Sequence, residues 1–533
     1  MRPFSHLLRA SLAICWLAAC GGGGTPVPVA PGVAPATAAT AAATPAGTSN
    51  ASNTPTPTPA PTPTPTAAAQ TAAADVAPGA PGCAALEPLP VIPDGARQVT
   101  EFGAIADDDL PDDDAIAAAL AAMGPGDWLV FPPGTYIQQR SILITRPYVT
   151  LWSEGAHLHA TNPVDHTLGL RADGVRVYGF ILTAVTDIRR DAAEQARISI
   201  YRDKSEPGLQ TGNVVRGNVI TQGDTADTAN AAGSVGILVY GASRFTVAGN
   251  VVRRTLADGI HVTGASREGR VLDNHVREVG DDLIAMVSYL GEGWQGRMRS
   301  DPDWAAAVEA GDVQVSQILV QGNDVADNYW GRGISVVGGR NITVRENHIA
   351  RTPYGAGVLV AQEGGYRTPG PRNVLIEGNT LSAVQTTAPP YVPEGDVFTW
   401  LRGLWRALGP RTGHAAVEIH AIQNSAVDAG DPALAAALAL RGVRVERNTL
   451  RDLGTDGVRI GVASLPGLIG QVAVVDNRFA QLAGATLRNA GDLSSLFCSG
   501  NVLDGAPALE SCPMPVALPA VSGATLDCAS LPQ

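Results

Sequence analysis

Asparagine recurs along this chain in one short context, Asn followed by any residue and then an apolar residue, often with glycine before it. The context occurs at Asn218, Asn250, Asn274, Asn323, Asn347, Asn379, Asn448, Asn477 and Asn501. Three of the gaps between successive asparagines are 24 residues, and a fourth gap of 49 residues is about twice as long. A period near 24 is too short for the blade of a β-propeller, which needs about 40 residues.

Each repeat contains two or three short stretches in which apolar and polar residues alternate, such as RFTVAGNVV and GIHVTG. Alternation with period two places one face of a strand inside and the other outside. We therefore predict an all-β fold, a right-handed parallel β-helix whose turns stack about 4.8 Å apart. Asparagines at equivalent turns can bond one another along the stack, so we interpret them as structural rather than catalytic.

The segment DDDAIAAALAAM predicts a short helix, with Asp113 or Asp114 as N-cap and Gly124 ending it. Together with VTEFGAIADDD before it and FPPGTY after it, this segment resembles the beginning of pectate-lyase-like β-helix proteins. The resemblance implies that the helix caps the open end of the coil. We interpret the acidic run 107–114 as a solvated cap, and we predict no required metal or cofactor, with calcium left open.

Residues 1–19 are predicted to be an export signal, with Arg2 and Arg9 before an apolar stretch too short to span a bilayer. The sequence Leu-Ala-Ala-Cys ending at Cys20 resembles the lipobox of bacterial lipoproteins, which implies cleavage before Cys20 and acylation of its thiol. Gly21 then implies an anchor in the outer membrane. Residues 20–82 are rich in Pro, Thr and Ala and are predicted to be a disordered linker, which leaves 83–533 as the folded domain.

The net charge of −13 argues against nucleic acid as a partner. The remaining cysteines are Cys83, Cys498, Cys512 and Cys528, which allow three pairings in an exported protein. We favour a staple that includes Cys498 and Cys512 and closes the C-terminal end, 498–533. The oligomeric state is not predicted.

The chemistry is predicted from three aspartates. Asp258 precedes GIHV, and the doublet Asp281-Asp282 follows 23 and 24 residues later, which is one turn of the coil. We therefore expect the three carboxylates to converge, with the doublet placed before a strand by a bend at Gly280. Mutual repulsion raises the pKa of at least one carboxylate, so that one holds a proton while others are ionised. Glycoside hydrolysis needs such an acid and base.

The pair ADGIHV and GDDLIA resembles the NTDGIHV and GDDCI pair of the polygalacturonase family, whose members are inverting glycoside hydrolases on a right-handed β-helix. The resemblance implies that Asp281 is the general acid and that Asp258 and Asp282 activate water. Arg332 stands where the family has the histidine of Gly-His-Gly, and YGAGVLVAQEGG lacks the family's Arg-Ile-Lys. The departures indicate a substrate other than polygalacturonate, with Arg332 as a carboxylate clamp or a base.

Two insertions, 290–312 and 385–438, interrupt the period beside these aspartates and are predicted to wall a cleft. The second contains Trp400, Trp405, His414 and His420. The residues predicted to bind substrate are His261, Arg332, Trp294, Arg297 and Trp330.

Three functions follow from this sequence. We favour a surface-tethered enzyme that hydrolyses a polysaccharide. The arginines would allow that polysaccharide to be acidic. The first alternative is a polysaccharide lyase or uronate C5-epimerase on the same fold. The second is a non-catalytic glycan-binding or structural protein, in which the aspartates are turn residues.

Overall fold

The computed structural model describes residues 86–187, 189, 192–203, 206–222, 230–392, 414–422, 431–461, 468–490, 493, 495–508, 521–527 and 531–532. The export signal, Cys20 and the linker lie outside these residues and stay predictions. The same holds for Cys83, Cys512, Cys528, Trp400 and Trp405. Within the described part of the chain, no helix has the length and apolar character that crossing a membrane requires.

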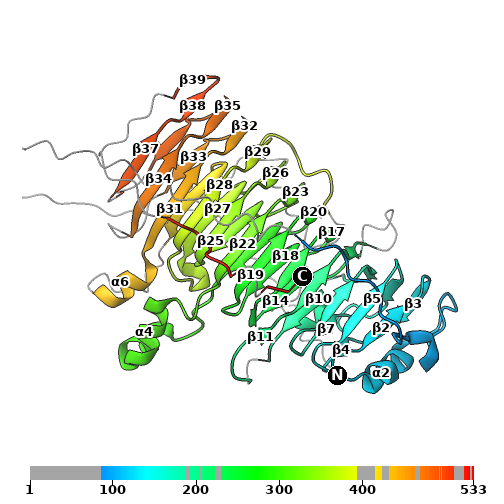
Figure 1. The fold of residues 1–533 in the computed structure, drawn as a ribbon. Helices are drawn as coiled ribbons and strands as arrows, with labels where there is room; N and C mark the ends of the chain where they lie inside the picture. Colours follow the sequence, from blue (N-terminus) through cyan, green and yellow to red (C-terminus); the bar gives the residue numbers. More distant parts are fainter. Residues whose placement is uncertain are drawn as a thin grey trace, which may run out of the picture. The chain divides into compact units, whose positions relative to one another are not determined.

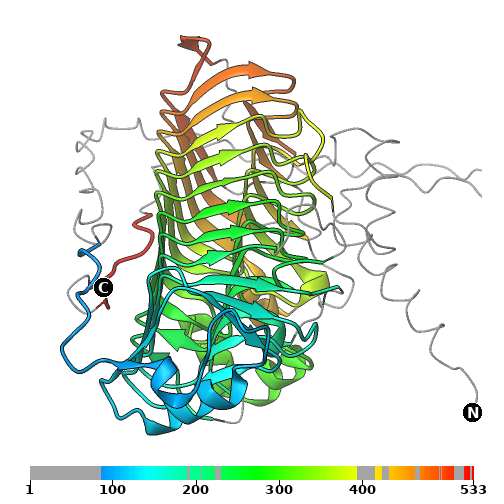
Figure 2. The same cartoon turned by 90° about the vertical axis from the view of Figure 1, so that its right-hand side faces the viewer.

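Three long sheets run along one coil, as the repeat predicted (Figures 1 and 2). Sheet 1 consists of β1 (Arg97–Gln98), β2 (Trp128–Phe131), β5 (Thr150–Ser153), β8 (Arg176–Tyr178), β12 (Val214–Arg216), β16 (Thr246–Ala248), β19 (Arg267–Leu272), β22 (Ser316–Gln321), β25 (Arg340–Arg345), β28 (Arg372–Glu377), β31 (Leu440–Glu446), β34 (Ile469–Val475) and β37 (Leu496–Ser499), with β11 (Gln210–Thr211) and β15 (Ala242–Ser243) beside them.

Sheet 2 carries the candidate site. It consists of β4 (Ile142–Ile144), β7 (Leu168–Leu170), β10 (Ala196–Tyr201), β14 (Val235–Tyr240), β18 (Ile260–Thr263), β21 (Ile284–Val287), β24 (Ile334–Val337), β27 (Val358–Glu363), β30 (Val417–Ile422), β33 (Val458–Ile460) and β36 (Leu487–Asn489).

Sheet 3 closes the coil. It consists of β3 (Thr135–Gln138), β6 (His157–Ala160), β9 (Ile181–Ala184), β13 (Val219–Ile220), β17 (Val251–Arg253), β20 (His275–Arg277), β23 (Asp324–Ala326), β26 (His348–Ala350), β29 (Thr380–Ser382), β32 (Thr449–Leu453), β35 (Arg478–Leu482), β38 (Val502–Leu503) and β39 (Ala506–Pro507). The strands of each sheet pair in parallel with those of the neighbouring turns, apart from the antiparallel pair β38–β39. The right-handed parallel β-helix is thereby confirmed.

The asparagines form one continuous ladder at the bend between sheet 1 and sheet 3, which confirms their structural interpretation. In a typical rung, the side-chain amide of Asn250 donates to Asn274 Oδ1 at 3.0 Å and to the Val215 carbonyl of the previous turn at 3.0 Å. The backbone N–H of Asn250 also donates to Asn274 Oδ1, at 3.0 Å. The same pattern links each asparagine of the set to the next.

The ladder also explains why glycine often precedes the asparagine. The preceding residue has a left-handed backbone at every rung, with φ between 53° and 70° at 217, 249, 273, 322, 346, 378, 447, 476 and 500. Glycine adopts this conformation without a steric penalty, whereas a residue with a Cβ is strained there. Five of these positions are glycine for this reason, and Asp273, Glu346, Arg447 and Asp476 occupy the others.

The N-terminal helix α2 spans Asp113–Ala122, with Asp112 rather than Asp113 or Asp114 as N-cap and Met123 rather than Gly124 as C-cap. The prediction of a solvated acidic cap was wrong for two of its residues. Asp112 accepts hydrogen bonds from the backbone of Ile105 and Ile137, and Asp113 accepts from Gln139 and Arg140, and both carboxylates are 5% exposed. They tie α2 to the first turn, where its apolar side chains enter the core.

The insertion at 290–312 folds into α3 (Trp294–Ser300) and α4 (Pro302–Ala310), and α6 (Pro432–Leu438) follows β30. Arg299 on α3 bonds Asp431, the N-cap of α6, at 2.9 Å. Short 3₁₀ helices are η2 (Val99–Phe102), η3 (Ala193–Gln195) and η4 (Gly364–Tyr366).

The C-terminal segment returns along the outside of sheet 1 (Figure 2). The backbone N–H groups of Ser522, Ala524 and Thr525 donate to Asn373, Thr343 and Gln317 side chains at 2.8–2.9 Å. Farther along, the Pro532 carbonyl accepts from Thr246 and Arg270, each at 2.6 Å. Cys498 is disulfide-bonded, and the predicted partner Cys512 lies outside the described residues.

We expect Asn323→Ala to lower the free energy of unfolding by a few kcal/mol. The change removes both bonds that Asn274 donates to Asn323 Oδ1 and both bonds that the Asn323 amide donates to Asn347 Oδ1 and the Val271 carbonyl. The buried Asn274 backbone N–H loses its acceptor, and each unsatisfied group costs about 1–3 kcal/mol. The measurement is urea unfolding followed by circular dichroism. Asn162→Ala at the surface is the matched control, and an equal loss in both variants would contradict the ladder's role.

Candidate active site

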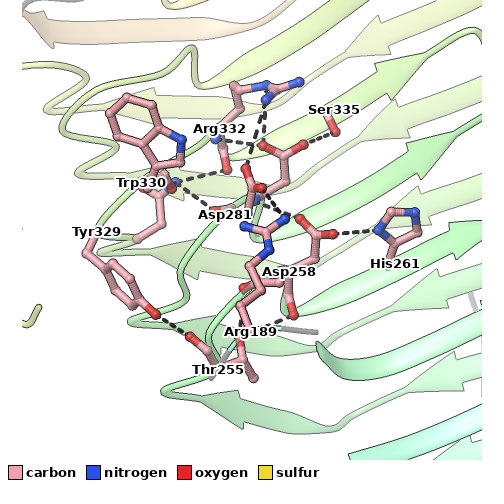
Figure 3. A network of polar contacts seen from close by, with 12 residues as sticks. Arg189, Thr255, Asp258, His261, Asp281, Tyr329, Trp330, Arg332 and Ser335 are labelled. Atoms are coloured by element: carbon pink, nitrogen blue, oxygen red, sulfur yellow. Dashed lines mark hydrogen bonds and ion pairs between the residues drawn. The ribbon is translucent and has the colours of Figure 1, made fainter. Parts of the chain in front are cut away.

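Three aspartates meet where two neighbouring turns of the coil enter sheet 2. Asp258 lies just before β18, and Asp281 and Asp282 lie just before β21, which pairs with β18 in parallel. One oxygen of each carboxylate lies within 4.8 Å of the others. The three residues are only 6%, 7% and 4% exposed, in that order. The structure thus brings together the three carboxylates that the sequence spacing predicted to converge (Figure 3).

Backbone geometry allows both members of the doublet to reach the same site, because both precede the strand. The Asp282 N–H donates to Asp258 Oδ1 at 3.0 Å and so ties the two turns together. A Cβ at Gly280 would overlap the Leu256 carbonyl and the Tyr329 hydroxyl, so this close approach requires glycine. Gly331 has φ 75° and lies against Asp281, where a Cβ would also overlap.

Two arginines and a histidine face the carboxylates (Figure 3). Arg189 bonds Asp281 Oδ2 at 2.9 Å, and His261 Nδ1 lies 2.5 Å from Asp258 Oδ2. Arg332 Nε lies 3.3 Å from Asp282 Oδ1, and the Arg332 Nη1 atom lies 4.0 Å from Asp281 Oδ1. The Arg332 backbone N–H also donates to Asp282 Oδ1 at 2.8 Å, and Ser335 Oγ donates to Asp282 Oδ2 at 2.5 Å.

The surroundings separate the charge states of the three carboxyl groups. Burial alone would raise the pKa of Asp258, but the charge and hydrogen bond of His261 hold that pKa below its ordinary value. Burial raises the pKa of Asp281 despite the charge of Arg189. Burial, reinforced by the negative charge of Asp281, raises the pKa of Asp282 to about 7 despite Arg332. Below about pH 7 the adjacent pair therefore holds a proton, whereas Asp258 ionises at a lower pH than an ordinary aspartate.

Arg332 also connects this site to a second set of buried charges. Its Nη2 atom lies 3.4 Å from Glu363 Oε1, and His420 lies between Glu363 and Glu418 at 3.8 and 3.5 Å. Arg459 pairs with Glu418 at 2.9 Å. The sequence gave no role to Glu363, and His420 was noted only as part of an insertion. The positions of these residues follow from the strand register. Glu418 pairs with Leu359, and His420 pairs with Ala361, on the outward face of sheet 2.

The carboxylates open into a cavity of about 680 Å³. Its lining includes five of the predicted site residues: Asp258, His261, Asp281, Asp282 and Arg332. It also includes tyrosines and small or apolar residues, among them Tyr201, Tyr240, Tyr289, Tyr366, Thr263, Ala285, Val287, Val337 and Leu238. Arg189 and Glu194 reach it from the segment before β10. Sequence reasoning did not identify Arg189, Tyr201 or Tyr240, because a cavity lining becomes apparent only once the register is known.

Three predicted substrate-binding residues do not belong to the described lining of this cavity. Trp294 is 5% exposed and packs into the hydrophobic core under α3. The Arg297 guanidinium lies 4.5 Å from the centre of the Trp304 ring and donates to the Leu290 carbonyl. Trp330 is 7% exposed and packs against Tyr354 with 5.2 Å between the ring centres. These contacts do not favour a role for the three side chains in binding sugar.

The three carboxylates are also the group of described residues whose oxygens lie close enough to hold a cation. Calcium would take carboxylate oxygens of this kind. Here Arg189, Arg332 and His261 already bond those oxygens, so a cation would have to displace them. The donor set therefore fits proton transfer better than metal binding.

No family model matches the chain, and no curated protein is similar to it in sequence. Solved structures resemble it. They include the catalytic unit of a thermostable GH87 alpha-1,3-glucanase from Streptomyces thermodiastaticus strain HF3-3, with 19% identity, 78% of this chain and 70% of that chain covered, and a TM-score of 0.52.

Two further matches have lower TM-scores. The catalytic domain of a GH87 alpha-1,3-glucanase in complex with nigerose has 14% identity, 78% and 70% coverage and a TM-score of 0.50. The Azotobacter vinelandii mannuronan C-5 epimerase AlgE6 A-module has 17% identity, 77% and 99% coverage and a TM-score of 0.49. At these identities the likeness concerns the fold, and the chain is a right-handed parallel β-helix protein.

Proposed function

We propose that this chain is a carbohydrate-active enzyme that hydrolyses glycosidic bonds in the cavity on sheet 2. The observation that carries the proposal is the convergence of three buried carboxylates, with one oxygen of each within 4.8 Å of the others. Their surroundings support unequal charge states, because His261 lowers the pKa of Asp258 while burial raises the pKa values of Asp281 and Asp282. Glycoside hydrolysis needs one carboxylic acid to protonate the leaving oxygen and one carboxylate to act on the other side of the bond.

Exposure assigns the roles within the three. The Asp281 side chain is 10% exposed and the Asp282 side chain 5%, so Asp281 is the better placed to donate a proton to the leaving oxygen. Asp258 then takes a proton from the attacking water, and His261 fixes the orientation of its carboxylate. Asp282 completes the site by sharing a proton and a charge with Asp281, and Arg189 balances the charge that Asp281 acquires.

The alpha-1,3-glucanases among the matches guide the choice of substrate for testing. Structures of such an enzyme hold nigerose or tetrasaccharides and carry single aspartate-to-alanine substitutions, at positions separated by 23 and 24 residues. These are statements about that enzyme. The same separations divide Asp258 from Asp281 and Asp282, so α-1,3-glucan belongs in the substrate panel.

We expect Asp281→Asn and Asp258→Asn each to lower kcat by at least about a hundredfold, the usual contribution of a positioned acid or base. The assay measures new reducing ends from a panel of neutral, acidic and bacterial polysaccharides with the purified full-length chain. Asp303→Asn on the exposed surface of α4 is the matched control.

The outcomes separate the competing functions. An unsaturated product that absorbs ultraviolet light would identify a lyase, and a changed uronate configuration without cleavage would identify an epimerase. Equal activity of the aspartate variants would make these residues structural. Absence of any product from the whole panel would overturn the proposal.

The pH dependence of kcat/KM tests the proton on the doublet. Activity should fall as the pH rises above about 7, because the Asp281–Asp282 pair loses its proton there. Ser335→Ala should move this fall to higher pH, since the Ser335 hydrogen bond favours the ionised form of Asp282. Ser300→Ala on α3 serves as control, and a fall that stays in place or moves to lower pH would contradict the assignment.

A further inference from the structure

Apart from Glu194, whose ion pair is with Arg171 outside the lining, the charged groups that line the cavity pair with one another. Among its described lining residues, the acidic side chains are Asp258, Asp281, Asp282, Glu194 and Glu363, and the cationic side chains are Arg189, His261 and Arg332. Each of the three cations bonds at least one carboxylate of the site. Arg332 contacts three of them.

This arrangement is unsuited to an acidic sugar. A uronate carboxylate would have to displace an aspartate or glutamate from an arginine, or lie beside carboxylates that outnumber the cations. In a buried site, water screens such repulsion poorly. An uncharged sugar ring meets no such cost and can accept and donate hydrogen bonds with the charged wall.

Beside the charged groups, the cavity lining includes a column of mostly small residues on sheet 2. The register pairs Tyr240 with Thr263 and Val287 with Val337, and it continues to Ala361 and His420 on the next two strands. Since these side chains stack about 4.8 Å apart, Thr263, Val287 and Val337 form a mainly apolar floor within the lining. Tyr240 stands at one end of that floor, and the buried His420 and its partner Glu363 stand at the other.

The Tyr240 side chain is held in place at one end of this floor. Its ring lies 5.1 Å from that of Tyr201 on the neighbouring strand, with 32° between the planes, and the Arg171 guanidinium lies 4.7 Å from the Tyr201 ring. A Cβ at Gly264 would overlap the Tyr240 ring, so glycine there leaves the space that the ring occupies. The tyrosine is therefore fixed before any ligand arrives, which lowers the entropy cost of binding.

We propose that this cavity binds an uncharged glycan, with one sugar ring packed on Tyr240 above the floor of Thr263, Val287 and Val337. Tyr240 pairs with Thr263, five residues after Asp258 and two after His261, so a ring on Tyr240 marks a subsite that lies along the strand from the carboxylates. This inference rests on the proposed function and adds to it the class of substrate and the position of one binding subsite.

Isothermal titration calorimetry with the full-length Asp281→Asn variant tests the proposal without cleavage of the ligand. The ligands are α-1,3-, α-1,4-, β-1,3- and β-1,4-linked gluco-oligosaccharides on one side and oligogalacturonates and oligomannuronates on the other. We expect at least one neutral series to bind more tightly than both acidic series.

In the same background, Tyr240→Ala should weaken that binding about tenfold, and Tyr240→Phe should retain it, because the aromatic face supplies the contact. Val287→Phe should weaken binding as well by filling the floor. Tyr148→Ala, at an exposed tyrosine outside the cavity lining, is the control. Thermal unfolding of each variant identifies any loss of folding, and the comparison of neutral with acidic ligands in the Asp281→Asn background does not depend on the cavity variants.

Tighter binding of the acidic series, unchanged binding by both cavity variants, or no binding of any ligand would overturn this inference. Neutral oligosaccharides that bind at Tyr240 but are never cleaved by the wild-type chain would instead overturn the proposed hydrolysis. Cleavage of acidic glycans alone would leave the hydrolysis standing and remove the assignment of an uncharged substrate.

Discussion

The buried asparagine ladder is the interaction on which the remaining structure depends. Each asparagine bonds the turn before it through a carbonyl and the turn after it through the next asparagine, so one side chain joins three turns. A slip of one residue in a strand would exchange its inner and outer faces. The ladder prevents such a slip in the turns from Asn218 to Asn501, and there it fixes which residues form the core and which form columns on the outside.

The candidate site uses that fixed register to assemble groups that disfavour one another. Three carboxylates are almost completely buried within 4.8 Å, which would strongly destabilise the fold if they were all ionised and unpaired. Arg189, Arg332 and His261 offset part of this cost, and a retained proton offsets more. The site therefore lowers the stability of the fold locally, and the rigid turns of the coil on either side keep the fold intact.

The sequence revealed the features that repeat and missed those that do not. The ladder needs the same side chain at every rung, and Asp258 and the doublet lie one turn apart, so both were visible as spacings. Trp294 and Arg297 lie outside the described cavity lining, and the spacing could not show this because an insertion has no periodic relation to the coil. Tyr240 and Glu363 are ordinary outward residues until register shows what lies beside them. Asp112 and Asp113 looked solvated because their partners, the amides of the first turn, leave no signal in sequence.

The returning C-terminal segment has a consequence for how the molecule comes apart. A solenoid with contacts only between neighbouring turns can unravel from either end, one turn at a time. Here residues 522–525 and Pro532 bond positions from Asn373 back to Thr246, across the strands β28, β25, β22, β19 and β16. Those turns, which include the ones carrying the carboxylates, are joined by contacts between residues up to 286 positions apart. They should therefore melt together as one cooperative block, while the turns beyond the strap fray on their own.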